Sequence, residues 1–450
     1  MPEVATSLHE LGAQEAAQLI RERKVSPVEL VTALLERASA MDGQVEAWET
    51  IAADSALAAA REAEQRAREG DETPLLGVPF GAKDIFDTAG LRTMAGFRPY
   101  GQRVPTADAE PVARLKQAGA ILLGKLVTTQ FAYADPSRTR NPWSADRTPG
   151  GSSSGSAAGV AVREVPLALG SQTAGSVLRP AAYTGIIGFK PTYGLVSKRG
   201  VLPLAWSLDH VGVLTRSVED VGVFLSAVAG HDPADPASVV PPTQASEQTL
   251  EAPRLGVVLD GLERAVPRVR DHVVDVAQRF EAAGAEVSEV RLNEPLDLIL
   301  GVHHLIFQTE AAAVHWQLLE QHTGAYAPRL RAYVEVGRLL PATAYLHAQR
   351  LRRRIRRQLA TLVSGVDALL LPTAVDVAPG RDTTGDPSLQ SPFSLVGFPS
   401  ISLPSGVLED EHLPLAIQLV AGPWQDQRLL QVAHWCESQL PPMPPPPVGA

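Results

Sequence analysis

The chain has 450 residues, of which 45% are hydrophobic and 20% are charged, so it holds enough apolar material for a large folded core. Its formal net charge of −10 argues against a protein that binds nucleic acid or an anionic membrane, because phosphate binding depends on positive surface charge. A small-molecule substrate fits this balance better.

The single cysteine, Cys436, excludes an intrachain disulfide and is compatible with a reducing compartment. The first 24 residues lack the apolar core of a signal peptide, and no stretch reaches the run of about 18 apolar residues that spans a bilayer. We therefore expect a cytoplasmic protein in which Cys436 is a buried side chain on a C-terminal helix.

Helix signals are strong in the first half of the chain. Ser26-Pro27-Val28-Glu29 combines a capping serine, a proline at the first helical position and a returning glutamate, which predicts a helix over 26–40. Further helices are predicted over 54–68 and 108–118, and another begins at Ser217.

Short apolar runs bounded by glycine and proline lie between and after these helices, which is typical of buried strands. Strands separated by helices indicate an α/β protein. We expect strands at 76–78, 121–123, 165–169, 186–189, 255–259 and 368–371.

The remaining segments are less regular. Residues 231–253 are rich in Asp, Pro, Ser and Thr and predict a long surface connection. Residues 302–362 are helical in composition, and their basic run 350–357 is interpreted as a solvated helix face. The proline-rich end, 441–450, predicts a disordered tail.

Three segments carry possible chemistry, and the first is 77–84, which contains Lys83. Lys83 follows an apolar run and precedes Asp84-Ile85-Phe86, so its amine is expected at the end of a buried strand. Burial disfavours the charged form of lysine, and a neutral lysine is a competent base for activating serine. The alternative is a surface lysine paired with Asp84.

The second segment, 150–159, is a Gly/Ser run that contains Ser152. A flexible linker is the alternative, but the run continues directly into a helix former at 157–162, which a linker would not do. It also matches G-x-S-x-G around Ser153, although no strand precedes it as that nucleophile motif requires.

The third segment, 170–176, follows a predicted strand. Gly175 lets the backbone approach a ligand closely, and the successive N–H groups of Thr173, Ala174, Gly175 and Ser176 are candidates to bind one oxyanion. A purely structural turn is the alternative.

Two other patterns are discounted. Residues 119–126 have the spacing of a phosphate loop, but the middle is an apolar strand and Leu126 stands where Ser or Thr is needed. His303-His304 and Asp209-His210 show no spacing that favours zinc, so they are interpreted as structural histidines.

Taken together and in this order, the three segments resemble the amidase signature family. The likeness is closest over 150–192, continues over 194–217, and includes flanking pieces such as 26–35 and 415–420, so it spans nearly the whole chain. The resemblance implies one domain over 1–440, with the signature core at 77–220 and a variable helical part near 295–365. It also implies a mixed central β-sheet covered on both faces by α-helices.

By this resemblance Lys83 is the base, Ser152 relays protons and Ser176 is the acylated nucleophile. The separation of 24 positions from Ser152 to Ser176 fits the family spacing and favours Ser152 over Ser153 or Ser154. The resemblance further implies a cis peptide bond before Ser152, an oxyanion hole at residues 173–176, and no cofactor or metal.

The sequence departs from the family pattern at two positions. Gln172 stands where many relatives carry an acidic residue, and Ala174 stands where many carry glycine. Both lie beside the expected oxyanion hole and leave its local hydrogen bonding open.

The function that follows is hydrolysis of a small to medium amide, by a monomer or homo-oligomer that needs neither nucleic acid nor membrane. The same site would suit a carbamate, urethane or carboxybiuret hydrolase. The glutaminase-type A subunit of a tRNA-dependent amidotransferase and a non-catalytic binding protein are two further candidate functions. Substrate preference is expected to reside in 295–350 and 374–398, where the candidate pocket residues are Phe307, Trp316, Tyr326, Tyr333 and Phe393.

Overall fold

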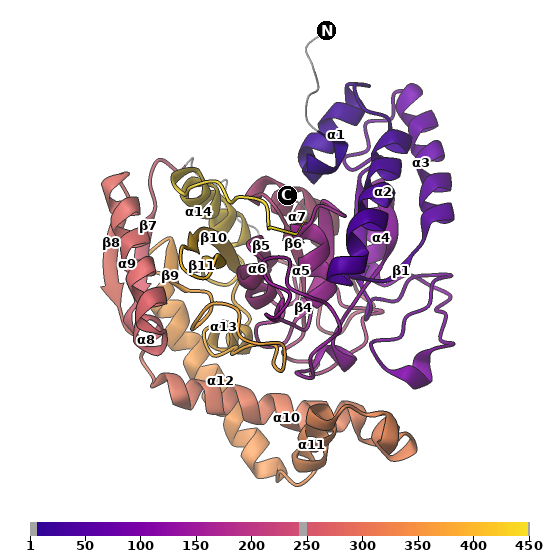
Figure 1. Cartoon of the computed structure of the whole chain (residues 1–450). Coiled ribbons are helices and arrows are strands. Elements are labelled where there is room, and N and C mark those ends of the chain that lie inside the picture. The colour runs from indigo at the N-terminus through magenta and orange to yellow at the C-terminus, as the bar shows by residue number, and fades with distance from the viewer. Residues whose placement is uncertain (1–6, 243–249, 449–450) are drawn as a thin grey trace.

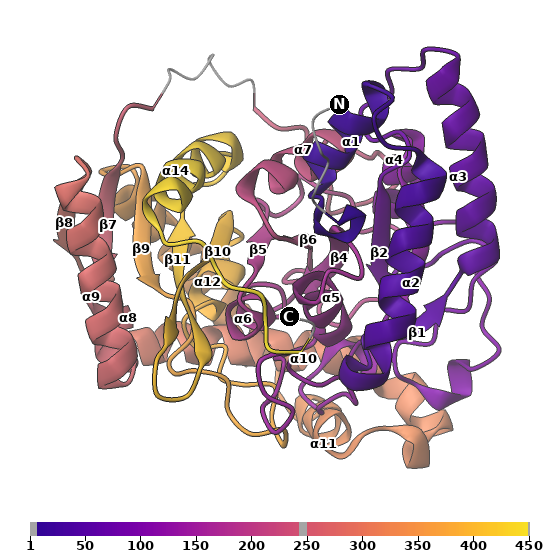
Figure 2. The same ribbon diagram turned by 45° about the horizontal axis from the view of Figure 1, so that its top comes forward.

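The computed structural model describes residues 7–242 and 250–448 of the chain. Within these residues, eleven strands form one sheet in the order β1-β3-β2-β4-β6-β5-β10-β11-β9-β7-β8 (Figures 1 and 2). The strands are β1 (Trp48–Ile51), β2 (Pro79–Lys83), β3 (Ile121–Leu126), β4 (Leu167–Gln172), β5 (Ile187–Lys190), β6 (His210–Thr215), β7 (Arg254–Val258), β8 (Glu286–Val290), β9 (Ala368–Pro372), β10 (Ser400–Leu408) and β11 (Leu413–Val420).

The sheet is mixed and helices cover both of its faces, so the predicted fold class is confirmed. Strand pairs β3–β2, β2–β4, β9–β7 and β7–β8 are parallel, and the other pairs are antiparallel. The helices are α1 (Ala13–Arg21), α2 (Pro27–Val45), α3 (Ala53–Arg68), α4 (Glu110–Gln117), α5 (Ser154–Ala161), α6 (Leu178–Thr184), α7 (Val218–Val228), α8 (Leu259–Arg264), α9 (Pro267–Ala282), α10 (Leu296–Gln321), α11 (Pro328–Gly337), α12 (Ala342–Val363), α13 (Ser391–Val396) and α14 (Asp426–Gln439).

The predicted helix starts are confirmed. The Ser26 side chain accepts from the N–H groups of Val28 and Glu29, and the Glu29 carboxylate accepts from the Ser26 N–H, which completes a capping box on α2. The Ser217 hydroxyl likewise accepts from the Asp220 N–H at the start of α7.

The strand prediction at 76–78 is wrong. Residues 74–77 form a turn, and the strand β2 begins only at Pro79. Proline is tolerated as the first residue of a strand, where its missing N–H costs no ladder bond. The apolar run before it is buried, and its backbone is bonded to the segment that leads into β3 without forming a strand: the Leu75 N–H donates to the Ala118 carbonyl and the Gly77 N–H to the Gly119 carbonyl.

Three features outside the site bear on the predictions. In the basic run, Ile355 is buried and Arg352 turns inward to donate to the Leu395 and Ser207 carbonyls, while the other arginines are exposed.

Cys436 is a free thiol buried on α14, as predicted, and burial raises its pKa. No helix in the described ranges is long and apolar enough to cross a membrane.

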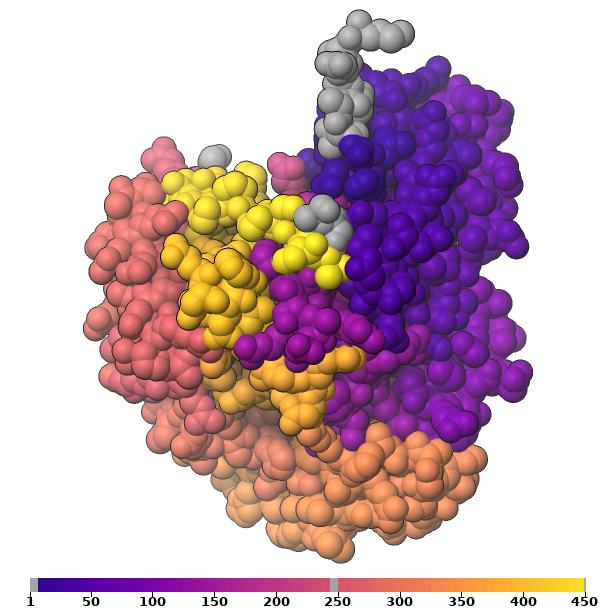
Figure 3. Space-filling view, viewed as in Figure 1, coloured from indigo at the N-terminus to yellow at the C-terminus, as the bar shows by residue number. Residues whose placement is uncertain are grey.

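The proline-rich end lies against the protein as far as residue 448 (Figure 3). Met443 packs with Trp143 and the Val448 N–H donates to the Pro142 carbonyl over 3.3 Å. Of the predicted surface connection, residues 243–249 lie outside the described residues.

The topology brings the three chemical segments together. Because β2 and β4 are parallel neighbours, their carboxyl ends meet at one edge of the sheet, which places Lys83 beside Ser171. Helix α5 packs beneath them and is buried at every position. A Cβ at Gly155 would lie 2.2 Å from the Ala47 carbonyl oxygen, so only glycine permits this close approach.

Candidate active site

Lys83, the last residue of β2, is fully buried. Its Nζ lies 2.7 Å from Ser152 Oγ and 2.8 Å from Ser171 Oγ. The alternative of a surface pair with Asp84 is wrong, because Asp84 is buried and pairs with Lys125 at 3.3 Å. Desolvation holds the pKa of Lys83 well below its ordinary value, which favours the neutral form of the amine, the form that can accept a proton.

The Gly/Ser run before α5 is a tightly bonded turn, not a linker. The Ser154 hydroxyl donates to the Gly150 carbonyl over 2.8 Å, and the Ser153 hydroxyl lies against the backbone of Ser171. These hydroxyls are occupied by backbone partners, whereas the Ser152 hydroxyl faces Lys83. The Gly151–Ser152 peptide bond is cis, as the resemblance implies.

Ser176 is 8% exposed and lies in the turn that follows β4. Its carbonyl accepts from the Ser153 N–H over 3.4 Å, so its backbone adjoins the Ser152 turn. Within the described residues its hydroxyl makes no hydrogen bond to Ser152 or Lys83. The structure therefore joins two of the three predicted triad side chains directly and brings the backbone of the third next to them.

The loop at 173–176 presents unpaired N–H groups. Within the described residues, the N–H groups of Ala174, Gly175 and Ser176 have no hydrogen-bond partner. The carbonyl of each of their peptide units is held instead: Thr173 O by His303 Nε2 at 3.1 Å, Ala174 O by Ser394 Oγ at 2.7 Å, and Gly175 O by Arg179 N at 2.9 Å. Because C=O and N–H point in opposite directions in a trans peptide, the three N–H groups point away from these partners and remain available to an oxyanion.

The two departures from the family pattern are accommodated. The Gln172 side chain accepts from the N–H groups of Val177 and Leu178 and donates to Ser394 Oγ over 3.1 Å. The Ser394 hydroxyl in turn donates to Ala174 O. The side-chain N–H of Gln172 therefore orients the Ser394 hydroxyl, and an ionised acidic residue at position 172 could not do so because it has no hydrogen to donate. Ala174 is not among the described residues with positive φ, so an alanine fits there without strain.

Arg179 on α6 connects this helix to the Ser152 turn. This buried residue donates from Nη2 to the Gly151 carbonyl over 2.7 Å, while its Nε and Nη1 have no partner within the described residues. The side chain thereby fixes the peptide unit that precedes Ser152.

Two residues beside the site were missed by the functional interpretation of the sequence. His303 on α10 was interpreted as structural, and it holds Thr173 O. Asp209 accepts the Thr173 hydroxyl over 2.6 Å and the N–H groups of Leu204 and Ala205. Thr173 is thus held through both its backbone and its side chain, by residues 130 and 36 positions away. No local pattern signals such long-range contacts.

Replacing His303 with leucine should lower kcat by about 10- to 100-fold with a smaller change in KM, since losing a full oxyanion donor costs about 10²–10³-fold and His303 acts on the loop indirectly. Burial lowers the pKa of His303 to about 4, so the neutral ring with hydrogen on Nε2 is the working form. His303→Gln, which keeps an N–H donor, should recover part of kcat in steady-state assays.

His315→Leu is the matched control, because His315 is equally buried on the same helix and contacts Tyr326 instead of the loop. It should cost stability without lowering kcat. Equal kcat losses in the His303 and His315 variants would show that His303 supports only packing.

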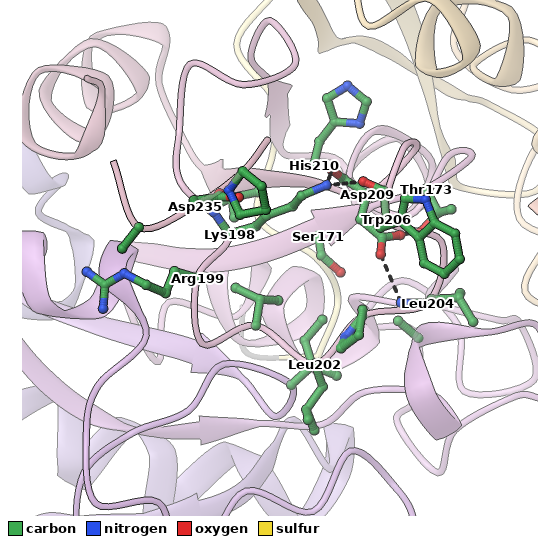
Figure 4. Close-up of a pocket in the computed structure, with 17 residues that line it drawn as sticks. Ser171, Thr173, Lys198, Arg199, Leu202, Leu204, Trp206, Asp209, His210 and Asp235 are labelled. Carbon is green, nitrogen blue, oxygen red and sulfur yellow. Dashed lines mark hydrogen bonds between the residues drawn. The ribbon is translucent and has the colours of Figure 1, made fainter. Parts of the chain in front are cut away.

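A cavity of about 310 Å³ adjoins the site, with Ser171 and Thr173 in its wall (Figure 4). Its other lining residues come mainly from 198–211 and 234–236. None of the five aromatic residues expected to form a substrate pocket lines it. Tyr326, Tyr333 and Phe393 are buried in the core, and Trp206 is the aromatic residue of this cavity.

The described residues contain no group of three or more His, Cys, Asp or Glu side chains placed to hold a metal ion. The arrangement brings together serine hydroxyls, a buried lysine amine and backbone N–H donors, and the chemistry that such groups can perform is acyl transfer.

Comparison with known proteins supports this interpretation. The Amidase family model matches residues 29–430. The A subunit of glutamyl-tRNA(Gln) amidotransferase from Roseiflexus sp. strain RS-1 is 35% identical over 469 aligned positions, covering 95% of this chain and 96% of that protein. The chain belongs to the amidase signature family.

Two solved structures share the fold. One, from a study of a vestigial protein complex and the origins of an s-triazine catabolic enzyme, has a TM-score of 0.89 and 30% identity over 96% of this chain and 99% of that one. The other is a crystal structure of an amidase, with a TM-score of 0.86 and 32% identity over 96% of this chain and 100% of that one.

Proposed function

We propose that the protein is a hydrolase that cleaves the C–N bond of a small to medium amide, or of the chemically similar carbamate, with Lys83, Ser152 and Ser176. The observation that carries this proposal is the wholly buried Lys83, with no ion pair within the described residues and its Nζ 2.7 Å from Ser152 Oγ. Burial favours the neutral form of such a lysine, and the neutral form is the one that a general base requires.

In the proposed course, Ser176 Oγ adds to the substrate carbonyl carbon and its proton passes through Ser152 to Lys83. The N–H groups of Ala174, Gly175 and Ser176 stabilise the oxyanion. The C–N bond then breaks as the proton returns through Ser152 to the leaving nitrogen. Water adds to the acyl-enzyme by the same route, which releases the acid and restores Ser176.

A glutaminase-type A subunit of a tRNA-dependent amidotransferase is the second candidate, and it is favoured by the 35% identity to the Roseiflexus protein. Such a subunit needs an arginine open to a free carboxylate. Arg179, three residues after Ser176, instead donates to the Gly151 carbonyl, and its Nε and Nη1 are buried. Arg179 is therefore not open to a substrate carboxylate.

The test is intact-mass analysis after exposure to an activated aryl ester, followed by peptide mapping. One acyl adduct per chain, located on Ser176, is expected. An adduct on Ser152 would overturn the assignment of roles, and a folded protein with no adduct would favour a binding protein. Ammonia release from glutamine by the isolated chain, without cleavage of other amides, would favour the second candidate.

A further inference from the structure

The cavity described above reaches Ser171, which is hydrogen-bonded to Lys83. Ser171 lies in its wall (Figure 4). The Ser171 hydroxyl is 2.8 Å from Lys83 Nζ. The cavity is therefore separated from the lysine amine by a single hydrogen bond. Lys83 itself has no exposed surface, so a molecule in the cavity would approach the amine through the Ser171 side.

The walls of the cavity are mainly apolar. Trp206 is 46% exposed at the rim, while Ile85 and Val211 are buried deeper in the wall. The apolar lining residues other than alanine and proline are Ile85, Val201, Leu202, Leu204, Trp206 and Val211.

The charged groups of the lining already have partners. Asp209 accepts three hydrogen bonds, and Lys198 Nζ contacts the Tyr193 hydroxyl and the Trp206 carbonyl. Arg199 is paired with Asp232, and Asp235 accepts from the Lys198 N–H. A cationic ligand would find each lining carboxylate already hydrogen-bonded, and Lys198 Nζ is held by neutral oxygens and not by a carboxylate. An apolar group would be transferred from water to an apolar surface.

The proposed reaction indicates which part of the substrate would lie in a cavity next to Ser171 and Lys83. The proton taken from Ser176 is held on Lys83 and must return through Ser152 to the nitrogen that leaves. The leaving nitrogen therefore stands on the Lys83 side of the scissile bond, and its substituent extends toward the space on that side.

We infer that this cavity binds the substituent of the leaving amine, and that the preferred substrates are amides or carbamates whose nitrogen carries an apolar group of about one ring. The inference rests on the proposed function. A volume of about 310 Å³ is at the small end of the range of ligand pockets, about 300–1,000 Å³, which suits a single ring or a short branched chain. Release of ammonia would leave the cavity unused.

The test compares an N-benzyl amide with the primary amide of the same acid, in wild type and in Leu202→Trp, whose larger side chain fills the cavity. Leu202→Trp should lower kcat/KM for the N-benzyl amide by about 10- to 100-fold and for the primary amide by less than about threefold. Because kcat/KM of the variant is divided by that of wild type for each amide separately, the difference in intrinsic reactivity between the two amides cancels.

Leu339→Trp is the control, because Leu339 is 81% exposed and remote from the cavity lining, and it should change neither rate. If Leu202→Trp does not fold, Trp206→Ala is used, and it should lower the preference for the N-benzyl amide. An equal loss on both amides, or no loss, would overturn the inference while the hydrolase function stands. Absence of any acyl-enzyme in wild type would overturn the hydrolase function itself.

Discussion

Ser176→Ala should lower kcat for an amide substrate by roughly 10⁵–10⁶-fold, because removal of the nucleophile leaves only binding and oxyanion stabilisation. The change deletes one hydroxyl that forms no hydrogen bond to Lys83 or Ser152 within the described residues, so folding should be unaffected. Single-turnover assays with a saturating amide measure the effect, and thermal melting confirms that the variant is folded.

Ser154→Ala is the matched control for the Ser176 variant. The Ser154 hydroxyl bonds the Gly150 carbonyl, which stabilises the turn without touching Lys83. It should cost stability of about 1 kcal/mol and leave kcat within about tenfold. Substantial turnover by Ser176→Ala, with Ser152→Ala inactive and unacylated, would identify Ser152 as the nucleophile.

Lys83→Met should lower kcat/KM by about 10²–10⁴-fold, the contribution of a positioned general base. Since burial depresses the pKa of Lys83, activity in the wild type should rise with pH through that lowered value and level off well below the ordinary lysine range. The pH profile of kcat/KM measures this, and the acid limb due to Lys83 should be absent from the variant.

The same substitution should raise the melting temperature. Between the depressed pKa of folded Lys83 and its ordinary value, the unfolded chain binds a proton that the folded chain does not. This difference in bound protons lowers the free energy of unfolding of the wild type as pH falls through the range. Methionine binds no proton in either state, so the variant lacks this loss. Thermal melts across this pH range should show a smaller slope for the variant.

Lys125→Met is the matched control, because Lys125 is also buried but neutralises Asp84. Its loss leaves a buried carboxylate without a counterion and should destabilise the fold by roughly 3–5 kcal/mol. A lower melting temperature in Lys83→Met than in wild type, of the size found for Lys125→Met, would show that Lys83 is charged in the folded protein.

What the sequence predicted well rests on local signals. The capped start of α2 and the helix that follows Ser217 depend on residues within one turn, and both formed as expected. The buried strand that carries Lys83 was predicted slightly early, because an apolar run does not distinguish a packed turn from a paired strand.

What the sequence did not predict depends on contacts across the chain. The long hairpin β10–β11 contains serines and prolines in place of a β-branched run, so its pairing with β5 and β9 had no clear pattern. The roles of His303 and Ser394 exist only once α10 and α13 lie against the loop after β4.

The long-range contacts of the 173–176 loop also determine when the candidate site can form as the chain is synthesised and folds. Lys83, Ser152 and Ser176 all lie in the first 176 residues, but the loop that would receive the oxyanion is held by Ser394, 220 positions beyond Ala174. Closing contacts over such separations is entropically costly and slow. During synthesis, Ser176, the proposed nucleophile, is therefore made long before Ser394, which holds the neighbouring Ala174 carbonyl, and the loop can take its final arrangement only after α13 has been made.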